Sequence, residues 1–272
     1  MANQRSDSVF AGSIPKLYDT LLVPLIFEPY ADDLATRLAS LRLERVLEIA
    51  AGTGVVTRAL ASTLPDRVSI VATDLNQAML DYASAVGTRR PVEWRQADAL
   101  QLPFADAQFD AAVCQFGAMF FPDKIKAYSE ARRVLRPGGL LLFNVWDRIE
   151  NNEFAATVTE ALRQMFSGDP PLFLQRTPHG YFDTQLIRAQ LASAGFTAMP
   201  QVATVMARSR ASSPRIPADA LCRGTPLLGE ITARDPSRVD EAVDRVAAAI
   251  AARFGHGAVE GRIQAHVISI ER

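Results

Sequence analysis

Cysteine and histidine are scarce in this chain, which has two cysteines and three histidines among its 272 residues. Cys114 and Cys222 stand far apart, without a CxxC pair or a Cys/His array around them. Neither a disulfide framework nor a structural zinc site fits this usage, so we expect no metal site. A chain of this kind is expected in the reducing cytoplasm.

An excess of positive charge is also missing, since the formal net charge is −1 at pH 7. Nucleic-acid binding depends on Lys and Arg that neutralise phosphates, so no nucleic-acid partner is expected. Two small arginine clusters, 89–90 and 208–210, are interpreted as solvated surface. No run of about 18 apolar residues and no signal-peptide core occurs, so no membrane anchor is expected either.

Alternating helical and strand patterns fill the first 146 residues. Strands separated by helices predict an α/β fold with a parallel sheet. Leu34, Leu38 and Leu41 share one face of the first helix, and Asp123 is placed to cap a later one. The expected strands are 44–50, 67–74, 91–98, 109–116 and 139–146, and the expected helices are 28–41, 76–86 and the segment that follows Asp123.

The second half of the chain has a less regular pattern. A helix is expected at 184–195, ended by Gly195, and a sixth strand within 197–209. The segment 212–231 contains three prolines and is predicted to be irregular. A long helix then follows, with Asp235 as its cap, Pro236 at its first position and Gly255 at its end, before a closing strand.

Residues 47–60, LEIAAGTGVVTRAL, place two glycines between a strand and a helix. Glycine at such a turn lets the backbone approach a ligand closely. The dinucleotide pattern GxGxxG is incomplete, because Thr57 stands where its third glycine belongs. Asp74 ends the second strand, where a carboxylate can bind both hydroxyls of a ribose. Glu48 would repel a pyrophosphate but suits an ammonium group, and Asp98 could accept a hydrogen bond from an adenine amino group.

These motifs, together with LRPGG at 135–139, resemble class I S-adenosylmethionine-dependent methyltransferases, in the style of the small-molecule enzymes of ubiquinone and menaquinone biosynthesis. The likeness is clearest over 44–146. It implies a Rossmann-like, doubly wound, mostly parallel seven-stranded sheet with the last strand antiparallel, plus a helical lid and insertions. One domain over 1–272 is expected, composed of a lid (1–43), a cofactor-binding core (44–146), acceptor-binding insertions with the sixth strand (147–235), and a closing helix and strand (236–272).

The family's first motif has an acidic residue and three glycines at alternate positions, and Ala50 stands where one glycine is usual. The resemblance also assigns Asp74 to the ribose, Asp98 with Ala99 to the adenine edge, and Tyr18 to the lid. The implied cofactor-binding set is Tyr18, Glu48, Ala50, Gly52, Thr53, Gly54, Asp74, Leu75, Met79, Asp98, Ala99, Gln115 and Phe116. Alternatives stay open, because Met79 suits a plain core position and Asp98 suits a loop cap.

The implied reaction is in-line transfer of the methyl group of S-adenosylmethionine, with S-adenosylhomocysteine as product, to a small hydrophobic or aromatic acceptor. Many such sites need no catalytic base; if one acts here, His179 is the candidate, because histidine titrates near neutrality. Trp146 is the favoured pocket residue, at the carboxyl end of a strand. The alternatives are an NAD(P)-dependent oxidoreductase and a non-catalytic cofactor-binding module, and a homodimer is left open.

Overall fold

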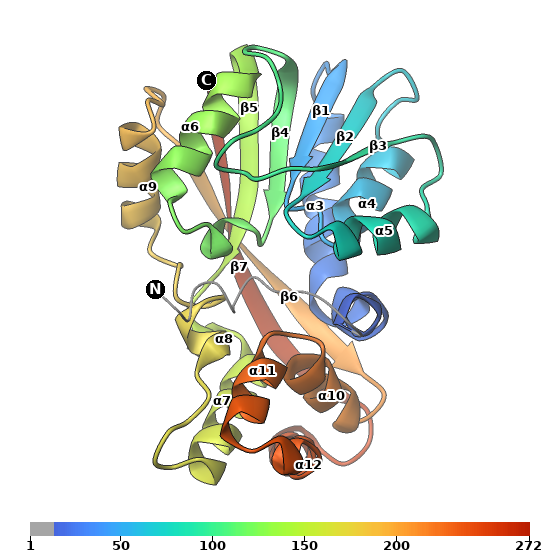
Figure 1. Ribbon diagram of the computed structural model, residues 1–272, viewed down its shortest axis with the longest axis vertical. Helices are drawn as coiled ribbons and strands as arrows, with labels where there is room; N and C mark the ends of the chain where they lie inside the picture. The colour runs from blue at the N-terminus through green and yellow to red at the C-terminus, as the bar shows by residue number, and fades with distance from the viewer. Residues whose placement is uncertain (1–13) are drawn as a thin grey trace. The chain divides into compact units, whose positions relative to one another are not determined.

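A seven-stranded sheet has the order β3-β2-β1-β4-β5-β7-β6 in the computed structural model of the chain, which describes residues 14–272 (Figure 1). The strands are β1 (Arg45–Ile49), β2 (Ser69–Asp74), β3 (Glu93–Gln96), β4 (Phe109–Gln115), β5 (Leu135–Trp146), β6 (Gln201–Ala211) and β7 (Val259–Glu271). The first five strands pair in parallel.

The closing strand β7 runs antiparallel to β5. Gly138 donates its backbone N–H to Arg272 (3.1 Å), whereas Asp147, at the other end of β5, donates to Gln264 (3.1 Å). Residue numbers therefore rise along one strand as they fall along the other. The predicted fold class, a mostly parallel seven-stranded sheet with an antiparallel last strand, is confirmed.

Helices connect the strands, and two predicted helix signals are confirmed. The side chain of Asp123 accepts a hydrogen bond from Lys126 N (2.9 Å), and Gly195 follows α9 with a φ of 94°. The helices are α2 (Ile14–Leu17), η1 (Tyr18–Phe27), α3 (Glu28–Ala39), α4 (Val55–Thr63), α5 (Gln77–Val86), η2 (Ala118–Phe120), α6 (Lys124–Val134), η3 (Ile149–Asn151), α7 (Glu153–Met165), α8 (Phe173–Arg176), α9 (Thr184–Ser193), α10 (Arg215–Arg223), α11 (Leu227–Arg234), η4 (Pro236–Arg238) and α12 (Val239–Phe254).

Two compact units can be distinguished in the described chain. Unit 1 comprises 14–27, 146–182 and 206–265, and unit 2 comprises 28–145, 183–205 and 266–272. Unit 2 holds the predicted cofactor-binding core, and unit 1 holds most of the predicted insertions. The expected single domain with its four segments stays a prediction, and the first 13 residues of the expected lid lie outside the described residues.

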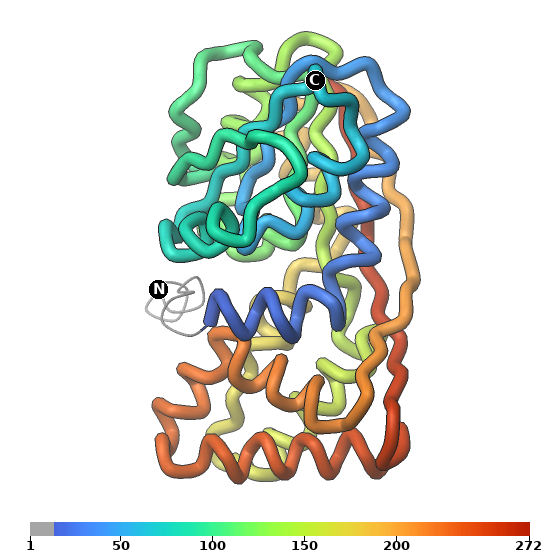
Figure 2. Tube along the Cα trace, turned by 90° about the vertical axis from the view of Figure 1, so that its right-hand side faces the viewer, coloured from blue at the N-terminus to red at the C-terminus, as the bar shows by residue number. Residues whose placement is uncertain are grey.

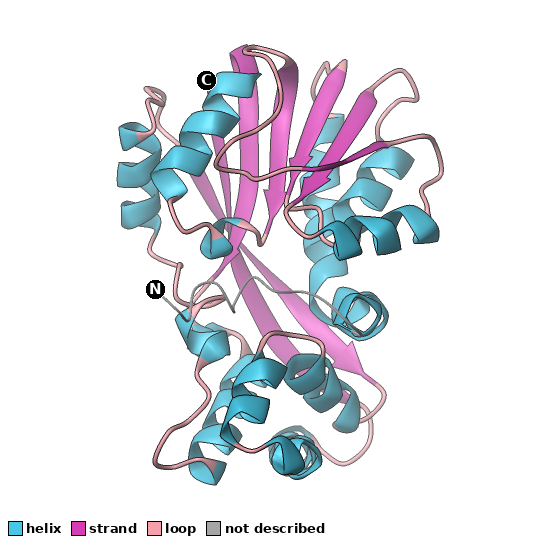
Figure 3. Ribbon diagram, viewed as in Figure 1, coloured by secondary structure: helices cyan, strands magenta, loops and turns pink. Residues whose placement is uncertain are grey.

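Unit 2 is a sheet flanked by helices (Figure 3), with an apolar core between them. Leu34 and Leu38 on α3 are fully buried in this core, and α3 packs against α4. Leu41 was expected on the same helical face, but that prediction is wrong: α3 ends at Ala39 and Leu41 is 42% exposed. The buried leucines hold α3 against the sheet through their apolar surface.

The proline-rich segment 212–231 was predicted to be irregular, and this is wrong, because α10 lies within it and α11 begins in it. Pro214 and Pro226 immediately precede the two helices, and Pro217 lies in the first turn of α10. A helix needs no backbone donor in its first turn, so these prolines begin helices rather than break them.

The beginning of β5 also differs from the prediction. The strand starts at Leu135 rather than at 139, because Leu135 already pairs with Phe109 before the register shifts to Ala111 and Leu140. One residue of β4, at position 110, thus lies opposite the four residues 136–139 of β5. An irregularity of this kind is not visible in the apolar pattern of the sequence.

In unit 1, α12 packs against α7 and α10, and Figures 1 and 2 both show α10 beside α12. Val243, Val246 and Ile250 form the fully buried face of α12. The cap at Asp235 is confirmed, since its side chain accepts from Ser237 N (2.9 Å), but a 3₁₀ turn, η4, precedes α12. Within residues 14–272, no helix is long and apolar enough to cross a membrane.

Candidate functional site

The turn between β1 and α4 places a left-handed residue at every second position. Ala50, Gly52 and Gly54 have φ values of 57°, 56° and 84°. A Cβ added at Gly54 would lie 2.9 Å from Trp94 Cη2, so that position needs glycine for space as well as for conformation. A Cβ added at Gly52 would meet no described atom within 4 Å. The turn is therefore open at Gly52, as the close approach of a ligand requires.

Ala50, which replaces a glycine of the family pattern, fits because a neighbour has no side chain. A Cβ added at Gly117 would lie 2.6 Å from Ala50 Cβ and 2.8 Å from Cys114 Sγ. The methyl group of Ala50 thus occupies space that Gly117 leaves empty. A left-handed backbone conformation costs a non-glycine residue roughly 1–2 kcal/mol, so the backbone at Ala50 is strained.

Asp74 lies directly against the glycine turn. Its Oδ2 accepts the backbone N–H of Gly52 (2.8 Å), and its Oδ1 accepts that of Asn76 (2.8 Å). Burial raises the pKa of Asp74 above its usual value, and these backbone donors oppose the rise. The structure therefore brings together two features that the sequence separated by 22 residues, the glycine turn and the acid at the end of β2.

Glu48 is a buried carboxyl group at the penultimate position of β1. Thr57 donates its hydroxyl to Glu48 Oε2 (2.5 Å). Burial, the largest cause, and the nearby Asp74 raise the pKa of Glu48 to about 8, while the Thr57 hydrogen bond opposes the rise. Near neutral pH, Glu48 is therefore mainly protonated in the free chain.

The end of β4 is held by a residue that the sequence analysis missed. Asn144 is fully buried on β5, and its Oδ1 accepts the backbone N–H of Phe116 (2.9 Å). Phe116 has a φ of 50°, so this hydrogen bond supports a backbone conformation that is rare for a large side chain. The available signal was a lone asparagine inside the apolar stretch 139–146, where a buried amide needs a partner.

Cys114, one residue before Gln115 on β4, is buried as well. Burial raises the pKa of its thiol to about 12, so it stays protonated and has no nucleophilic role at neutral pH. Among the described residues, no group of three or more His, Cys, Asp or Glu side chains is placed to hold a metal ion.

The residues predicted to surround the adenine differ in exposure. Asp98 is exposed in the loop after β3, and its Oδ1 accepts the backbone N–H of Leu100 (2.8 Å). Leu75, next to Asp74, is also exposed, so both side chains are accessible to a ligand. Met79, by contrast, is buried in the core, which favours the alternative that it only fills space.

Tyr18 and His179 belong to unit 1, apart from the other predicted site residues, which all belong to unit 2. They lie at the two ends of a row of rings. Tyr18 stacks on Phe27 with centroids 5.0 Å apart, Phe27 lies 6.0 Å from Trp146, and Trp146 lies 5.8 Å from His179. We call these four residues the aromatic row.

His179 lies in the turn that follows α8, but its side chain is not exposed. The ring is buried, and Nδ1 lies 2.9 Å from the backbone oxygen of Asp147. Burial lowers the pKa of His179 to about 4, so the expectation that it titrates near neutrality is wrong. Because a carbonyl oxygen can only accept, Nδ1 carries the proton of the neutral ring and Nε2 is its acceptor atom.

Comparisons with known proteins agree with the resemblance to methyltransferases that the sequence motifs show. A family model described as a methyltransferase domain matches residues 47–143. The chain is 31% identical over 166 residues to the ubiquinone/menaquinone biosynthesis C-methyltransferase UbiE of Teredinibacter turnerae, a match that covers 56% of this chain and 67% of that protein. The chain belongs to the class I S-adenosylmethionine-dependent methyltransferases.

Other relatives of this methyltransferase match shorter segments or share only the fold. Demethylmenaquinone methyltransferase of Deinococcus radiodurans is 41% identical over 100 residues, which cover 36% of this chain and 41% of that protein. The YcgJ protein of Bacillus subtilis is 18% identical with a TM-score of 0.58, covering 90% of this chain and 98% of its own. The matches to the two curated relatives thus span 41% and 67% of those proteins.

Membership of the family makes the chain an enzyme that uses S-adenosylmethionine, as the resemblance implied. It decides against the NAD(P)-dependent oxidoreductase and against the non-catalytic module. The binding roles of the individual residues, from Glu48 to Phe116, stay predictions.

Proposed function

We propose that this methyltransferase acts on a small acceptor that is hydrophobic or aromatic. The observation that carries the proposal is the aromatic row of Tyr18, Phe27, Trp146 and His179. Tyr18 is partly exposed, whereas Trp146 and His179 are buried. Rings arranged in this way favour a planar apolar molecule, through burial and through stacked or edge-to-face contacts. The names of two curated relatives, which refer to quinone biosynthesis, support the same class of acceptor.

Other aromatic residues of unit 1 are better explained as core. Phe154 packs edge-to-face against Phe254, with centroids 5.1 Å apart, and lies beside Gly261. Phe173 is fully buried. We therefore assign the acceptor to the aromatic row and not to these phenylalanines.

In the proposed mechanism, S-adenosylmethionine would supply its methyl group to the acceptor atom, with S-adenosylhomocysteine as product. The sulfonium already activates the methyl group, so the protein contributes alignment and exclusion of water. Asp74 would hold the ribose, Asp98 the adenine and Glu48 the ammonium group. His179 would accept a hydrogen bond from an acceptor hydroxyl at Nε2, and this orients the acceptor without a charged imidazole.

Binding of S-adenosylmethionine should release a proton from Glu48. The free carboxyl group is protonated below about pH 8, whereas a neighbouring ammonium group favours the carboxylate. Affinity should therefore rise as the pH approaches about 8. Calorimetric titration at pH 7 in two buffers of different ionisation enthalpy should show the proton as a buffer-dependent heat.

The variant Glu48→Gln should lose this buffer dependence. Glu93→Gln is the matched control, because Glu93 is an exposed glutamate on β3 of the same unit, and it should behave as the wild type. If the binding heat of the wild type is the same in both buffers, Glu48 does not bind the ammonium group as proposed.

The acceptor class can be tested with radiolabelled S-adenosylmethionine and a panel of acceptors. The panel contains hydroxylated aromatic rings with and without an apolar chain, small polar amines, and a nucleic acid. We expect methylation of the hydroxylated rings, and a higher KM for them in Trp146→Ala with unchanged affinity for S-adenosylhomocysteine. Methylation of the polar amines alone would contradict the proposal.

A further inference from the structure

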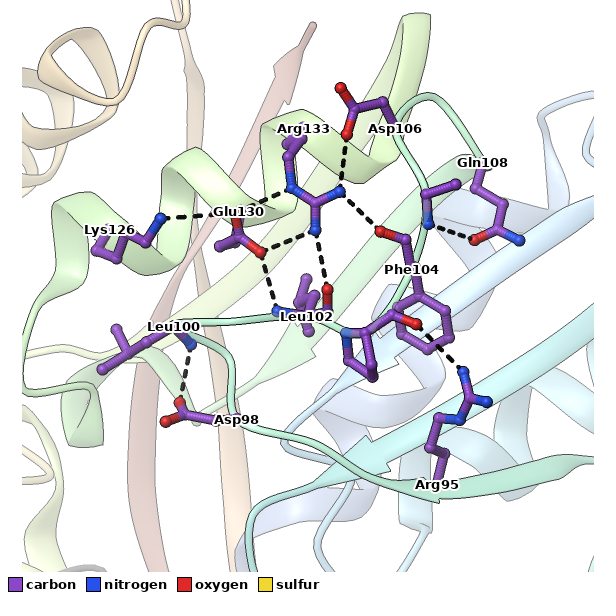
Figure 4. Close-up of polar contacts among 12 residues, drawn as sticks. Arg95, Asp98, Leu100, Leu102, Phe104, Asp106, Gln108, Lys126, Glu130 and Arg133 are labelled. Carbon is purple, nitrogen blue, oxygen red and sulfur yellow. Dashed lines mark hydrogen bonds and ion pairs between the residues drawn. The ribbon is translucent and has the colours of Figure 1, made fainter.

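The loop that follows β3 is fastened to α6 by one arginine side chain. Arg133 donates from Nη2 to the backbone oxygen of Leu102 (2.9 Å) and from Nη1 to that of Phe104 (2.7 Å). Nη1 also donates to the carboxylate of Asp106 (2.8 Å). Figure 4 shows the guanidinium pointing into the loop, with these acceptors around it. A planar guanidinium with several donors can hold several carbonyl groups in one fixed arrangement.

Glu130, one turn earlier on α6, completes the fastening. Its Oε2 accepts the backbone N–H of Leu102 (2.9 Å) and a hydrogen bond from Arg133 Nη2 (2.9 Å). Glu130 is buried, and Arg133 lowers its pKa below the usual value, so it is a carboxylate in the folded chain. Both backbone groups of Leu102 are thus bound to a charged pair of side chains.

The far end of the loop is joined to the same region by the backbone. Ala107 donates its N–H to the backbone oxygen of Arg133 (3.0 Å), and Gln108 donates to that of Val134 (2.7 Å). Arg95 on β3 adds a hydrogen bond to Pro103 O (3.3 Å). The segment from 102 to 108 is therefore fixed along its length, although it contains no helix or strand.

Asp98 lies in the same loop, four residues before Leu102. Asp98 accepts the backbone N–H of Gln101 at its carbonyl (3.0 Å) and that of Leu100 at Oδ1 (2.8 Å). These short-range hydrogen bonds connect Asp98 rigidly to residues 100 and 101, and Leu102 follows directly. Asp98 thus lies between two attachments: Ala97 donates its N–H to the backbone oxygen of Asp74 (3.0 Å) on one side, and Arg133 and Glu130 hold Leu102 on the other.

We propose that Arg133 and Glu130 are positioning residues for the base of the cofactor, because they set the place at which Asp98 meets the adenine amino group. This inference rests on the proposed role of Asp98. It assigns a specificity function to an ion pair on α6, in which Glu130 is buried and Arg133 is partly exposed.

Nucleobase selectivity separates this role from a purely structural one. Adenine presents an amino group that donates to a carboxylate, whereas hypoxanthine presents an oxygen that a carboxylate repels. A well-placed Asp98 therefore favours S-adenosylhomocysteine over S-inosylhomocysteine. A variant that only loosens the fold weakens both ligands alike, whereas a displaced Asp98 lowers the ratio of the two affinities.

The experiment measures the dissociation constants of both ligands by calorimetry for the wild type and five variants. Asp98→Ala should lower the adenine preference about tenfold or more, the usual effect of losing a hydrogen bond to a charged group. Arg133→Gln and Glu130→Gln should lower it by about fivefold, and Arg133→Lys, which keeps the cation, should lie between Arg133→Gln and the wild type. Arg132→Gln is the matched control and should leave the ratio unchanged. Arg132 is on the same helix as Arg133, but its side chain lies beside Gly195, which follows α9.

All titrations are made at a temperature where circular dichroism shows each variant folded. If Asp98→Ala lowers the preference and Arg133→Gln and Glu130→Gln do not, the positioning role is overturned and the role of Asp98 stands. If Asp98→Ala itself keeps the wild-type preference, the proposed adenine site is wrong. Equal loss in Arg132→Gln and Arg133→Gln would also overturn the inference.

Discussion

Replacement of His179 by alanine is expected to lower the turnover of methyl transfer about tenfold to a hundredfold, the order of effect that loss of acceptor alignment produces. The reason lies in the fixed tautomer of the ring. Nδ1 is hydrogen-bonded to the backbone oxygen of Asp147, which leaves Nε2 as an acceptor beside the ring of Trp146. The affinity for S-adenosylhomocysteine should not change, because the proposed cofactor contacts come from other residues.

The control for this variant is His256→Ala, which removes an exposed histidine outside the aromatic row and should keep full turnover. A folded His179→Ala protein with wild-type turnover on a hydroxylated aromatic acceptor would limit His179 to a structural part. Steady-state rates at saturating S-adenosylmethionine, with kcat and KM for the acceptor determined separately, provide the measurement.

The same residue predicts a dependence of stability on pH. Folding lowers the pKa of His179 from 6.5 to about 4, so its contribution to stability is present above pH 6.5 and is lost as the pH falls through about 4. The thermal midpoint of the wild type should decrease over this acid range, and that of His179→Asn should decrease less. Turnover should show no inflection near pH 6.5 from this residue, because its ring stays neutral there.

Asp74→Ala is expected to weaken the binding of S-adenosylhomocysteine by about 1–3 kcal/mol, which corresponds to roughly a 5- to 150-fold higher dissociation constant. The substitution removes the proposed acceptor for the ribose hydroxyls. It also removes the acceptor of Gly52 N–H and Asn76 N–H, so the glycine turn loses one of its attachments to β2 and keeps the backbone hydrogen bond from Ala51 to Thr73. Calorimetric titration of the folded variant measures the combined effect.

Asp74→Asn helps to separate these two effects, since an amide oxygen can still accept one of the backbone donors but carries no charge. We expect it to keep most of the thermal stability and to lose much of the affinity. Asp81→Ala serves as the control, because Asp81 is an exposed carboxylate on α5 that pairs with Gln77. Wild-type affinity in a folded Asp74→Ala protein would exclude Asp74 from the ribose site.

Local sequence signals account for the parts of the fold that were predicted well. The glycine turn, the cap at Asp123 and the stop at Gly195 all depend on the backbone conformation of a few neighbouring residues, whereas the binding role of Asp74 stays a prediction. Such conformations restrict the residue types directly, so they can be recognised without knowledge of the tertiary structure. The mostly parallel seven-stranded sheet with its antiparallel last strand followed from the resemblance and is confirmed.

The parts that were missed depend on contacts between segments distant in sequence. His179 is buried by its tertiary neighbours, so its low pKa could not be deduced from the loop sequence around it. In the sequence, Arg133 and Glu130 have the spacing of ordinary charged residues on a helix surface. Their hydrogen bonds to Leu102 are visible only in the folded structure. Pro217 contributed to the prediction of irregular structure, because a proline fits a loop and the first turn of a helix equally well.

The contact between Ala50 and Gly117 has a consequence for the evolution of this enzyme. The two positions share space for a single methyl group beside Cys114 Sγ, although they are 67 residues apart. A relative with alanine at position 50 is restricted to glycine at 117. A side chain at 117 needs glycine at 50 and also a shift of the residue-114 side chain, since Cys114 Sγ would lie 2.8 Å from its Cβ. The residues at positions 50 and 117 should therefore covary among relatives. This covariation would help to recognise the turn of the first motif in relatives that have replaced its glycines.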